Sequence, residues 1–189
     1  MRKVIVSNLV TLDGFFEGLK GELDWFVVEG EFFDYVKEMF KTVDTILYGR
    51  KTYEHMAAYW PNATDNDATI THMMNKLPKI VLSKTLSKAD WNNSRIIKEN
   101  IPEEIHELKK LPGKDIVIFG SGEIVSYLSN LGLIDEYRII LNPVILGKGS
   151  PMFKNIDGKI KLNLFKTRKL NSGVIVLYYQ PEKIKIKLS

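Results

Sequence analysis

Two short glycine-containing segments carry the residues best suited to chemistry. The first, Tyr48-Gly-Arg-Lys-Thr-Tyr53, follows a β-branched run and opens a helical pattern. Backbone N–H groups at a helix start have no partner within the helix, and the helix dipole favours an anion there. Gly49 allows a ligand to approach the backbone, while Arg50, Lys51 and Thr52 add two cations and a hydroxyl. These are the ingredients of a phosphate site, and a capped helix with solvated charges is the alternative interpretation.

The second segment, Phe119-Gly-Ser-Gly-Glu123, ends an apolar run and again opens a helical pattern. Adjacent small residues at this point would allow a pyrophosphate to contact the backbone. The segment is only a fragment of the dinucleotide fingerprint, because a third glycine would fall at Val125. A single Gly-x-Gly is weak evidence for a nucleotide site. If both segments follow neighbouring parallel strands, however, one extended dinucleotide can span them, and we predict that arrangement.

Composition excludes several other chemistries. The chain has no cysteine, which rules out disulfides, thiolate metal sites and a cysteine nucleophile. His55, His72 and His106 are too far apart in sequence to suggest a metal pair, and P-loop and Gly-x-Ser-x-Gly motifs are absent. The 27 basic and 23 acidic residues are interleaved, so we expect no nucleic-acid partner. No apolar run approaches the roughly 18 residues of a membrane span, and we expect a soluble, cytoplasmic protein.

The surrounding pattern predicts one α/β domain over residues 1–189. Short β-branched runs alternate with helical periodicity, which is typical of a parallel sheet covered by helices. Expected strands cover 3–10, 45–48, 79–83, 95–98, 115–119, 137–142, 161–167 and 174–179, and expected helices cover 31–42, 51–59, 102–110 and 123–131, the last closed by Gly132. The last two strands form a hairpin across 171–173, which gives a mostly parallel sheet of about eight strands with an antiparallel C-terminal hairpin. Residues 183–188 resemble a charged edge strand, and 62–71 is expected to be a polar loop, either a flap over a site or a plain connection.

Taken in order, the motifs resemble the dihydrofolate reductase superfamily. More closely, they are similar to the C-terminal reductase domain of the bifunctional riboflavin-biosynthesis deaminase/reductase and its stand-alone relatives. The matching pieces are Ser7-Asn-Leu-Val-Thr-Leu-Asp-Gly14, Leu47-Tyr-Gly-Arg-Lys-Thr-Tyr-Glu54, Ile80-Val-Leu-Ser83, Val117-Ile-Phe-Gly-Ser-Gly122, Asp135-Glu-Tyr137 and Asn142-Pro-Val-Ile-Leu-Gly-Lys-Gly-Ser-Pro-Met-Phe153. They cover about residues 3–180. The resemblance implies a three-layer dihydrofolate reductase-like fold, a homodimer and an NADPH-dependent reductase.

The resemblance also implies a set of cofactor contacts. Gly49, Arg50, Lys51 and Thr52 would hold the phosphates of NADPH, including its 2′-phosphate. Leu82 and Ser83 would border the adenosine half of the cofactor. The pyrophosphate and nicotinamide half would lie against Gly120, Ser121 and Gly122. Asn8 and Leu9 would face the nicotinamide, and Asp13-Gly14 would begin a loop that closes over it.

The resemblance leaves the catalytic acid and the substrate open. Asp34 falls within about one residue of the helix carboxylate of the folate enzymes, with Glu31 as the second candidate; an exposed acid beside Lys37 and Lys41 is the alternative. We expect hydride transfer to a C=N or C=O carbon of a small molecule. The substrate would pack between Phe32, Phe33 and Tyr35 of the expected first helix and residues 143–149, unless these aromatic residues belong to the ordinary core. A ribosyl-phosphate pyrimidine of riboflavin biosynthesis is the first candidate and a pterin the second; a non-catalytic NADPH sensor or an oligomerising structural protein are alternatives of another class.

Overall fold

The central feature of the molecule is an eight-stranded sheet with the strand order β5-β4-β3-β6-β1-β7-β10-β9. The computed structural model describes residues 1–28, 30–120 and 122–182. In chain order the elements are β1 (Val4–Val10), β2 (Phe15–Glu17), α1 (Glu31–Phe40), β3 (Val43–Gly49), α2 (Arg50–Tyr59), a 3-10 turn (Trp60–Asn62), α3 (Ala68–Lys76), β4 (Lys79–Leu82), β5 (Ser94–Ile97), α4 (Ile101–Lys110), β6 (Asp115–Ile118), α5 (Gly122–Asn130), β7 (Glu136–Leu141), β8 (Ser150–Pro151), β9 (Leu162–Lys169) and β10 (Ile175–Pro181).

Strand pairing confirms the predicted α/β fold. From β5 to β7 all neighbouring strands are parallel, whereas β10 pairs antiparallel with both β7 and β9. The β9–β10 hairpin turns where it was expected, because Leu170 and Val174 pair across the turn and Gly173 has a φ of +87°. Gly132 closes α5 as predicted, with a φ of +64°. The segment 183–188, expected as an edge strand, lies outside the described residues.

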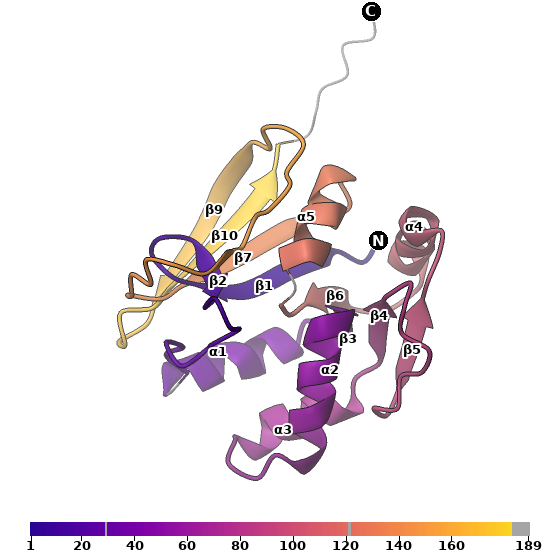
Figure 1. The fold of residues 1–189 in the computed structure, drawn as a ribbon, viewed down its shortest axis with the longest axis horizontal. Coiled ribbons are helices and arrows are strands. Elements are labelled where there is room, and N and C mark those ends of the chain that lie inside the picture. The colour runs from indigo at the N-terminus through magenta and orange to yellow at the C-terminus, as the bar shows by residue number, and fades with distance from the viewer. Residues whose placement is uncertain (29, 121, 183–189) are drawn as a thin grey trace, which may run out of the picture.

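The sheet separates two helical layers (Figure 1). Alternate strand residues such as Val4, Leu47 and Ile118 pack against α4 and α5 in one cluster. On the other face, Ile46 and Val117 belong to clusters that include residues of α1, α2 and α3. The alternation follows from the pleat of a strand, which sends successive side chains to opposite faces. The result is a three-layer arrangement with apolar packing on both faces of the sheet.

Two elements differ from the sequence-based expectation. The segment 62–71 is not one polar loop, because α3 begins at Ala68 within it. The Asp67 carboxylate caps this helix by accepting hydrogen bonds from the N–H groups of Thr69 and Ile70 at 2.9 and 3.2 Å. On the inner face of this helix, the side chains of Ile70 and Met74 are buried. The second difference is a small antiparallel pair, β2 with β8, which was not expected.

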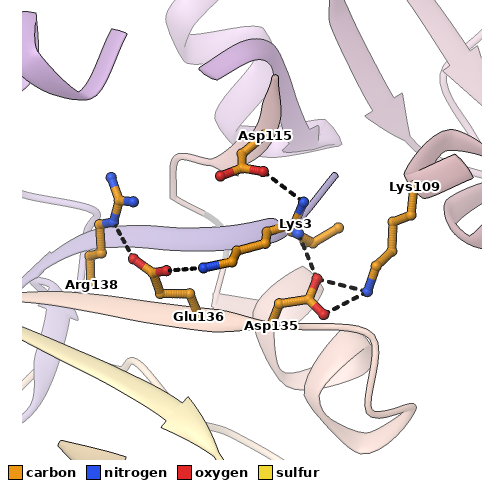
Figure 2. Close-up of polar contacts among 7 residues, drawn as sticks. Lys3, Lys109, Asp115, Asp135, Glu136 and Arg138 are labelled. Atoms are coloured by element: carbon orange, nitrogen blue, oxygen red, sulfur yellow. Dashed lines mark hydrogen bonds and ion pairs between the residues drawn. The ribbon is translucent and has the colours of Figure 1, made fainter. Parts of the chain in front are cut away.

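The amino ends of the strands are joined by charged side chains (Figure 2). The Lys3 backbone N–H donates to Asp115 at 2.8 Å, and the Lys3 ammonium lies 3.3 Å from the Glu136 carboxylate. Asp135 binds the Lys109 ammonium at 2.7 Å and also accepts the backbone N–H of Val4 at 2.8 Å. The network therefore attaches the start of β1 to β6, β7 and α4. It lies at the opposite end of β1 from Asn8, so we assign it a structural role.

No helix within the described ranges has both the length and the hydrophobicity that would be needed to cross a bilayer.

Candidate functional site

The junction between β3 and α2 presents a helix start at the carboxyl edge of the sheet. Gly49 is the last residue of β3 and the N-cap of α2, and no side chain of the described residues caps this helix. Its first N–H groups therefore remain available to an anion. The Arg50 guanidinium contacts both carboxylate oxygens of Glu54, at 3.1 and 3.0 Å. The Lys51 side chain is 73% exposed.

The junction between β6 and α5 brings backbone close to neighbouring elements. Gly120 has a φ of +71°, a conformation that favours glycine, and its N–H donates to the Asn8 side-chain oxygen at 2.8 Å. Gly122 opens α5 so close to β8 that a Cβ there would lie 2.9 Å from the Met152 carbonyl oxygen. Ser121, the third predicted cofactor residue of this junction, lies outside the described residues.

The two junctions lie side by side. Strands β3 and β6 are parallel neighbours, which confirms the predicted arrangement. A Cβ placed on Gly120 would lie only 2.7 Å from the Cγ2 atom of Thr52, so the first turn of α2 packs directly on the second junction. A contact of 4.0 Å between Lys51 and Glu123 joins the starts of the two helices. One extended ligand can therefore contact both helix starts.

A cavity of about 450 Å³ opens beside these junctions, between β1 and the helices α1, α2 and α3. Its size is within the range of small-molecule sites. Four of the predicted cofactor residues line it: Asn8, Leu9, Thr52 and Gly120. Most of the remaining lining is aromatic or aliphatic. The polar side chains are fewer: Ser7, Asn8, Glu17, Thr52, His55 and Asn66, with the hydroxyl groups of Tyr35 and Tyr59. The site is thus a mostly apolar pocket adjoining the starts of α2 and α5.

The other predicted cofactor residues lie along the same edge without lining the cavity. Leu82 stands opposite Gly49 in the β3–β4 register, and Ser83 follows it. The Ser83 hydroxyl is used locally, because it accepts the N–H of Leu86 at 3.0 Å. Gly49, Arg50, Lys51 and Gly122 are likewise outside the described lining. Their assignment to the adenosine and phosphate portions of a cofactor stays a prediction.

Two hydroxyl groups meet in the wall of the cavity. Ser7 on β1 and Tyr35 on α1 are both buried, and their oxygens are 3.4 Å apart. That separation is long for a bond between hydroxyls, so each group keeps hydrogen-bonding capacity, and both residues line the cavity. Burial raises the pKa of Tyr35 to about 12, against the smaller opposing effect of the Ser7 hydrogen bond. The Tyr35 phenol is therefore neutral at physiological pH and able to donate.

The acidic candidates lie away from this wall. The side chain of Asp34 is 62% exposed and pairs with Lys37 at 2.9 Å, the surface arrangement weighed as the alternative for it. Glu31 accepts the backbone N–H of Asn171 at 2.7 Å. Neither residue lines the cavity. A catalytic role for Asp34 stays a prediction that would require a change in the direction of its side chain.

The outer wall of the cavity is formed by segment 16–28 and not, as predicted, by residues 143–149. Phe16, Glu17, Leu23, Phe26 and Val28 line the cavity, as do Phe32, Phe33 and Tyr35 of α1, whereas no described residue of 143–149 does. Residues 143–149 do not reach the cavity because Asp13 binds their backbone.

Asp13 holds that segment. Its carboxylate accepts N–H groups of Leu146 and Gly147 at 3.1 and 2.7 Å. The Thr11 hydroxyl, followed by these amides, lowers the pKa of Asp13 to about 2. The segment that begins with Asp13 and Gly14 is thus bound to the segment after β7, and the carboxylate stays charged at ordinary pH.

Two parts of the site were not predicted. The wall formed by Ile70 and Met74 belongs to α3, whose capping aspartate and apolar spacing up to Leu77 were signals available in the sequence. The contribution of segment 16–28 had no comparable local signal, because it depends on how the segment folds over α1.

Fold and site together define an α/β protein that presents a ligand site at the carboxyl edge of a mostly parallel sheet. A family model, the RibD C-terminal domain, matches residues 2–176. The uncharacterized protein YyaP of Bacillus subtilis (strain 168) is 38% identical over 182 residues, covering 94% of both chains. The chain therefore belongs to the RibD C-terminal domain family, which confirms the predicted resemblance.

Solved structures show the same fold. A protein of Shewanella sp. PV-4 that carries a provisional riboflavin-biosynthesis name matches with a TM-score of 0.76 and 21% identity, covering 96% of this chain and 99% of its own. The Thermotoga maritima diaminohydroxyphosphoribosylaminopyrimidine deaminase/5-amino-6-(5-phosphoribosylamino)uracil reductase matches with a TM-score of 0.69 and 13% identity, over 96% of this chain and 57% of that one. Family membership supports a reductase-type role.

Proposed function

We propose that this protein is an NADPH-dependent reductase that delivers a hydride to a carbon of a small molecule in the cavity. The observation that carries the proposal is the contact between the two helix starts, where Gly120 packs on Thr52 beside the cavity. The nicotinamide of NADPH, when bound, would supply the hydride. Family membership supports the choice of reaction class.

The residues present fit such a cofactor. The uncapped start of α2 and the adjacent Arg50 and Lys51 provide donors and positive charge for phosphates. The positive φ of Gly120 and its missing side chain allow close approach to the backbone. Leu9 and the aromatic lining would exclude water from the nicotinamide ring. The chain's own contribution would be to orient two bound molecules in a dry space.

Arg50→Ala tests the assignment of the 2′-phosphate. Loss of a charged hydrogen-bonding partner should weaken NADPH binding about 10- to 100-fold, and NADH binding by less than about threefold. Titration followed by nicotinamide fluorescence measures both affinities. Arg168→Ala is the matched control, because Arg168 also pairs with a helix glutamate, Glu38, but lies on the edge strand β9.

Equal losses for NADPH and NADH would show that Arg50 does not meet the 2′-phosphate. Failure of the unmodified protein to bind either nucleotide would overturn the proposed function itself. Tight NADPH binding without consumption of NADPH, across aminopyrimidine, pterin and neutral carbonyl substrates, would favour a non-catalytic NADPH sensor.

A further inference from the structure

We propose that the substrate of this site is an uncharged, flat and largely apolar molecule whose reducible C=O or C=N group binds to Ser7 and Tyr35. This inference rests on the proposed function and specifies its substrate. It departs from the phosphorylated pyrimidine named for the Thermotoga maritima enzyme.

The walls of the cavity are mostly aromatic and aliphatic. On the α1 side they consist of Phe32, Phe33, Met39 and Phe40, and Phe119 and Trp60 continue the surface. Aromatic faces and a polarizable thioether favour a flat ring system over a sugar, whose hydroxyl groups would find few partners there. Burial of apolar surface would thus provide most of the binding free energy.

The cavity carries few charged side chains. Among its described lining residues there is no lysine or arginine, and the carboxylate and imidazole side chains are those of Glu17 and His55. Segment 16–28, which forms the outer wall, contains Glu17, Glu22 and Asp24 against one base, Lys20. A phosphate placed in this space would lose its hydration shell beside the Glu17 carboxylate, with no lysine or arginine of the described lining to compensate.

The one lysine of α1, Lys37, already forms two ion pairs. Lys37 lies 2.9 Å from Asp34 and 3.3 Å from Asp67, and it is outside the described lining of the cavity. Arg50 and Lys51 lie at the start of α2, where the proposed function places the phosphates of NADPH. No lysine or arginine lines the described part of the cavity, and Arg168, whose guanidinium lies 5.9 Å from the centre of the Tyr35 ring, is paired with Glu38 at 2.6 Å.

The buried hydroxyl pair can bind the reducible group. Ser7 and Tyr35 are polar groups in a mostly apolar wall, and their mutual contact of 3.4 Å leaves both able to bind a heteroatom. Because the Tyr35 phenol is neutral, it can donate to a carbonyl oxygen or imine nitrogen. In the reaction, a hydride from NADPH would form the new C–H bond, and the heteroatom would take a proton from water. The products are NADP⁺ and an alcohol or amine.

A pair of aldehydes tests the charge selectivity. 2-Naphthaldehyde is flat, neutral and reducible, and 6-formyl-2-naphthoate differs from it by one carboxylate. Isothermal titration calorimetry with the whole protein, with and without NADP⁺, which supplies no hydride, should show at least about tenfold tighter binding of the neutral compound. Equal or tighter binding of the carboxylate would overturn the inference, as would tighter binding of 5-amino-6-(5-phosphoribosylamino)uracil than of 2-naphthaldehyde. Titrations without NADP⁺ keep these outcomes separate from a failure of cofactor binding.

A gained charge provides a second test that does not depend on losing function. Leu23 lines the cavity and its side chain is partly exposed, so Leu23→Lys can be accommodated. It should tighten binding of 6-formyl-2-naphthoate about three- to tenfold. Leu19→Lys, in the same segment but outside the cavity lining, should leave that affinity unchanged. An equal response of both variants would contradict the placement of the ligand.

Tyr35→Phe tests the polar contact. We expect 2-naphthaldehyde to bind this variant about three- to tenfold more weakly, whereas naphthalene, which lacks the carbonyl group, should bind the variant and the unmodified protein alike. A parallel loss for both compounds would show that Tyr35 only shapes the cavity, and would overturn the proposed carbonyl contact.

Discussion

Gly120→Ala should weaken NADPH binding on the order of 100-fold, equivalent to about 2.7 kcal/mol. The added Cβ would lie 2.7 Å from Thr52 Cγ2 and 3.1 Å from its Oγ1, so the Thr52 side chain or the start of α2 must shift. The φ of +71° adds a conformational penalty of about 1–2 kcal/mol for a side-chain-bearing residue. Both effects disturb the surface on which the pyrophosphate is proposed to lie. Fluorescence titration with NADPH measures the loss.

Gly132→Ala is the control for backbone strain. Gly132 also has a positive φ, +64°, but a Cβ there would meet no atom within 4 Å. Both variants should lose similar free energy of unfolding from strain, and only Gly120→Ala should lose NADPH affinity. Comparable NADPH affinity for the two variants would contradict the placement of the cofactor at this junction.

The second large effect concerns pH and the buried Lys79. This side chain is fully buried, and its ammonium donates to the backbone oxygens of Asn75, Leu77 and Asn92 at 2.9, 2.8 and 3.1 Å. It also lies 4.3 Å from the centre of the Trp91 ring. Burial lowers the pKa of Lys79 from 10.5 to about 8. The lysine is therefore still charged at neutral pH, at a cost to stability.

The direction of the pH effect follows from the two pKa values. Below about pH 8, Lys79 is protonated in both the folded and the unfolded state, so the cost of burying its charge is fully present. Between about 8 and 10.5 the unfolded state binds more protons, and stability rises with pH. Relative to Lys79→Met, the unmodified protein should gain roughly 2 kcal/mol in free energy of unfolding between about pH 7 and pH 10.

Urea unfolding at the two pH values measures this gain. The free energy of unfolding of the variant is subtracted from that of the protein at each pH. This subtraction removes the contribution of the tyrosines, whose titration also changes stability in alkali. Lys76→Met is the matched control, because Lys76 ends α3 three residues before Lys79 but is exposed, and it should produce no such pH dependence. A flat difference for Lys79→Met would show that the three carbonyl groups fully compensate for the burial of the charge.

The sequence predicted the fold well where local periodicity reflects tertiary position. The run Ile116–Phe119 is apolar because β6 is buried on both faces, and Gly132 ends α5 because only a positive φ permits that turn. The adjacency of Gly49 and Gly120 was predictable as well, since parallel strands end at one edge of the sheet. Helix α3 was missed because the polar residues before it, which end with the capping Asp67, resemble a loop and hide the start of the helix.

The interior of the site was less predictable, because it depends on contacts between distant segments. Asp13 follows β1 closely, yet its partners, Leu146 and Gly147, follow β7. Segment 16–28 reaches the cavity only through the way it lies over α1. The meeting of Ser7 and Tyr35 likewise joins a strand to a helix. None of these contacts leaves a periodic pattern in the sequence.

The charged network at the amino end of β1 has a practical consequence for protein engineering. Lys3, Asp135 and Glu136 secure β1 at one end, while Asn8 and Leu9 serve the cavity near the other. Helix α3 and segment 16–28 form part of the pocket wall but contribute no strand to the main sheet. Both pieces can therefore be redesigned for a different guest molecule while the anchoring of the scaffold is left intact.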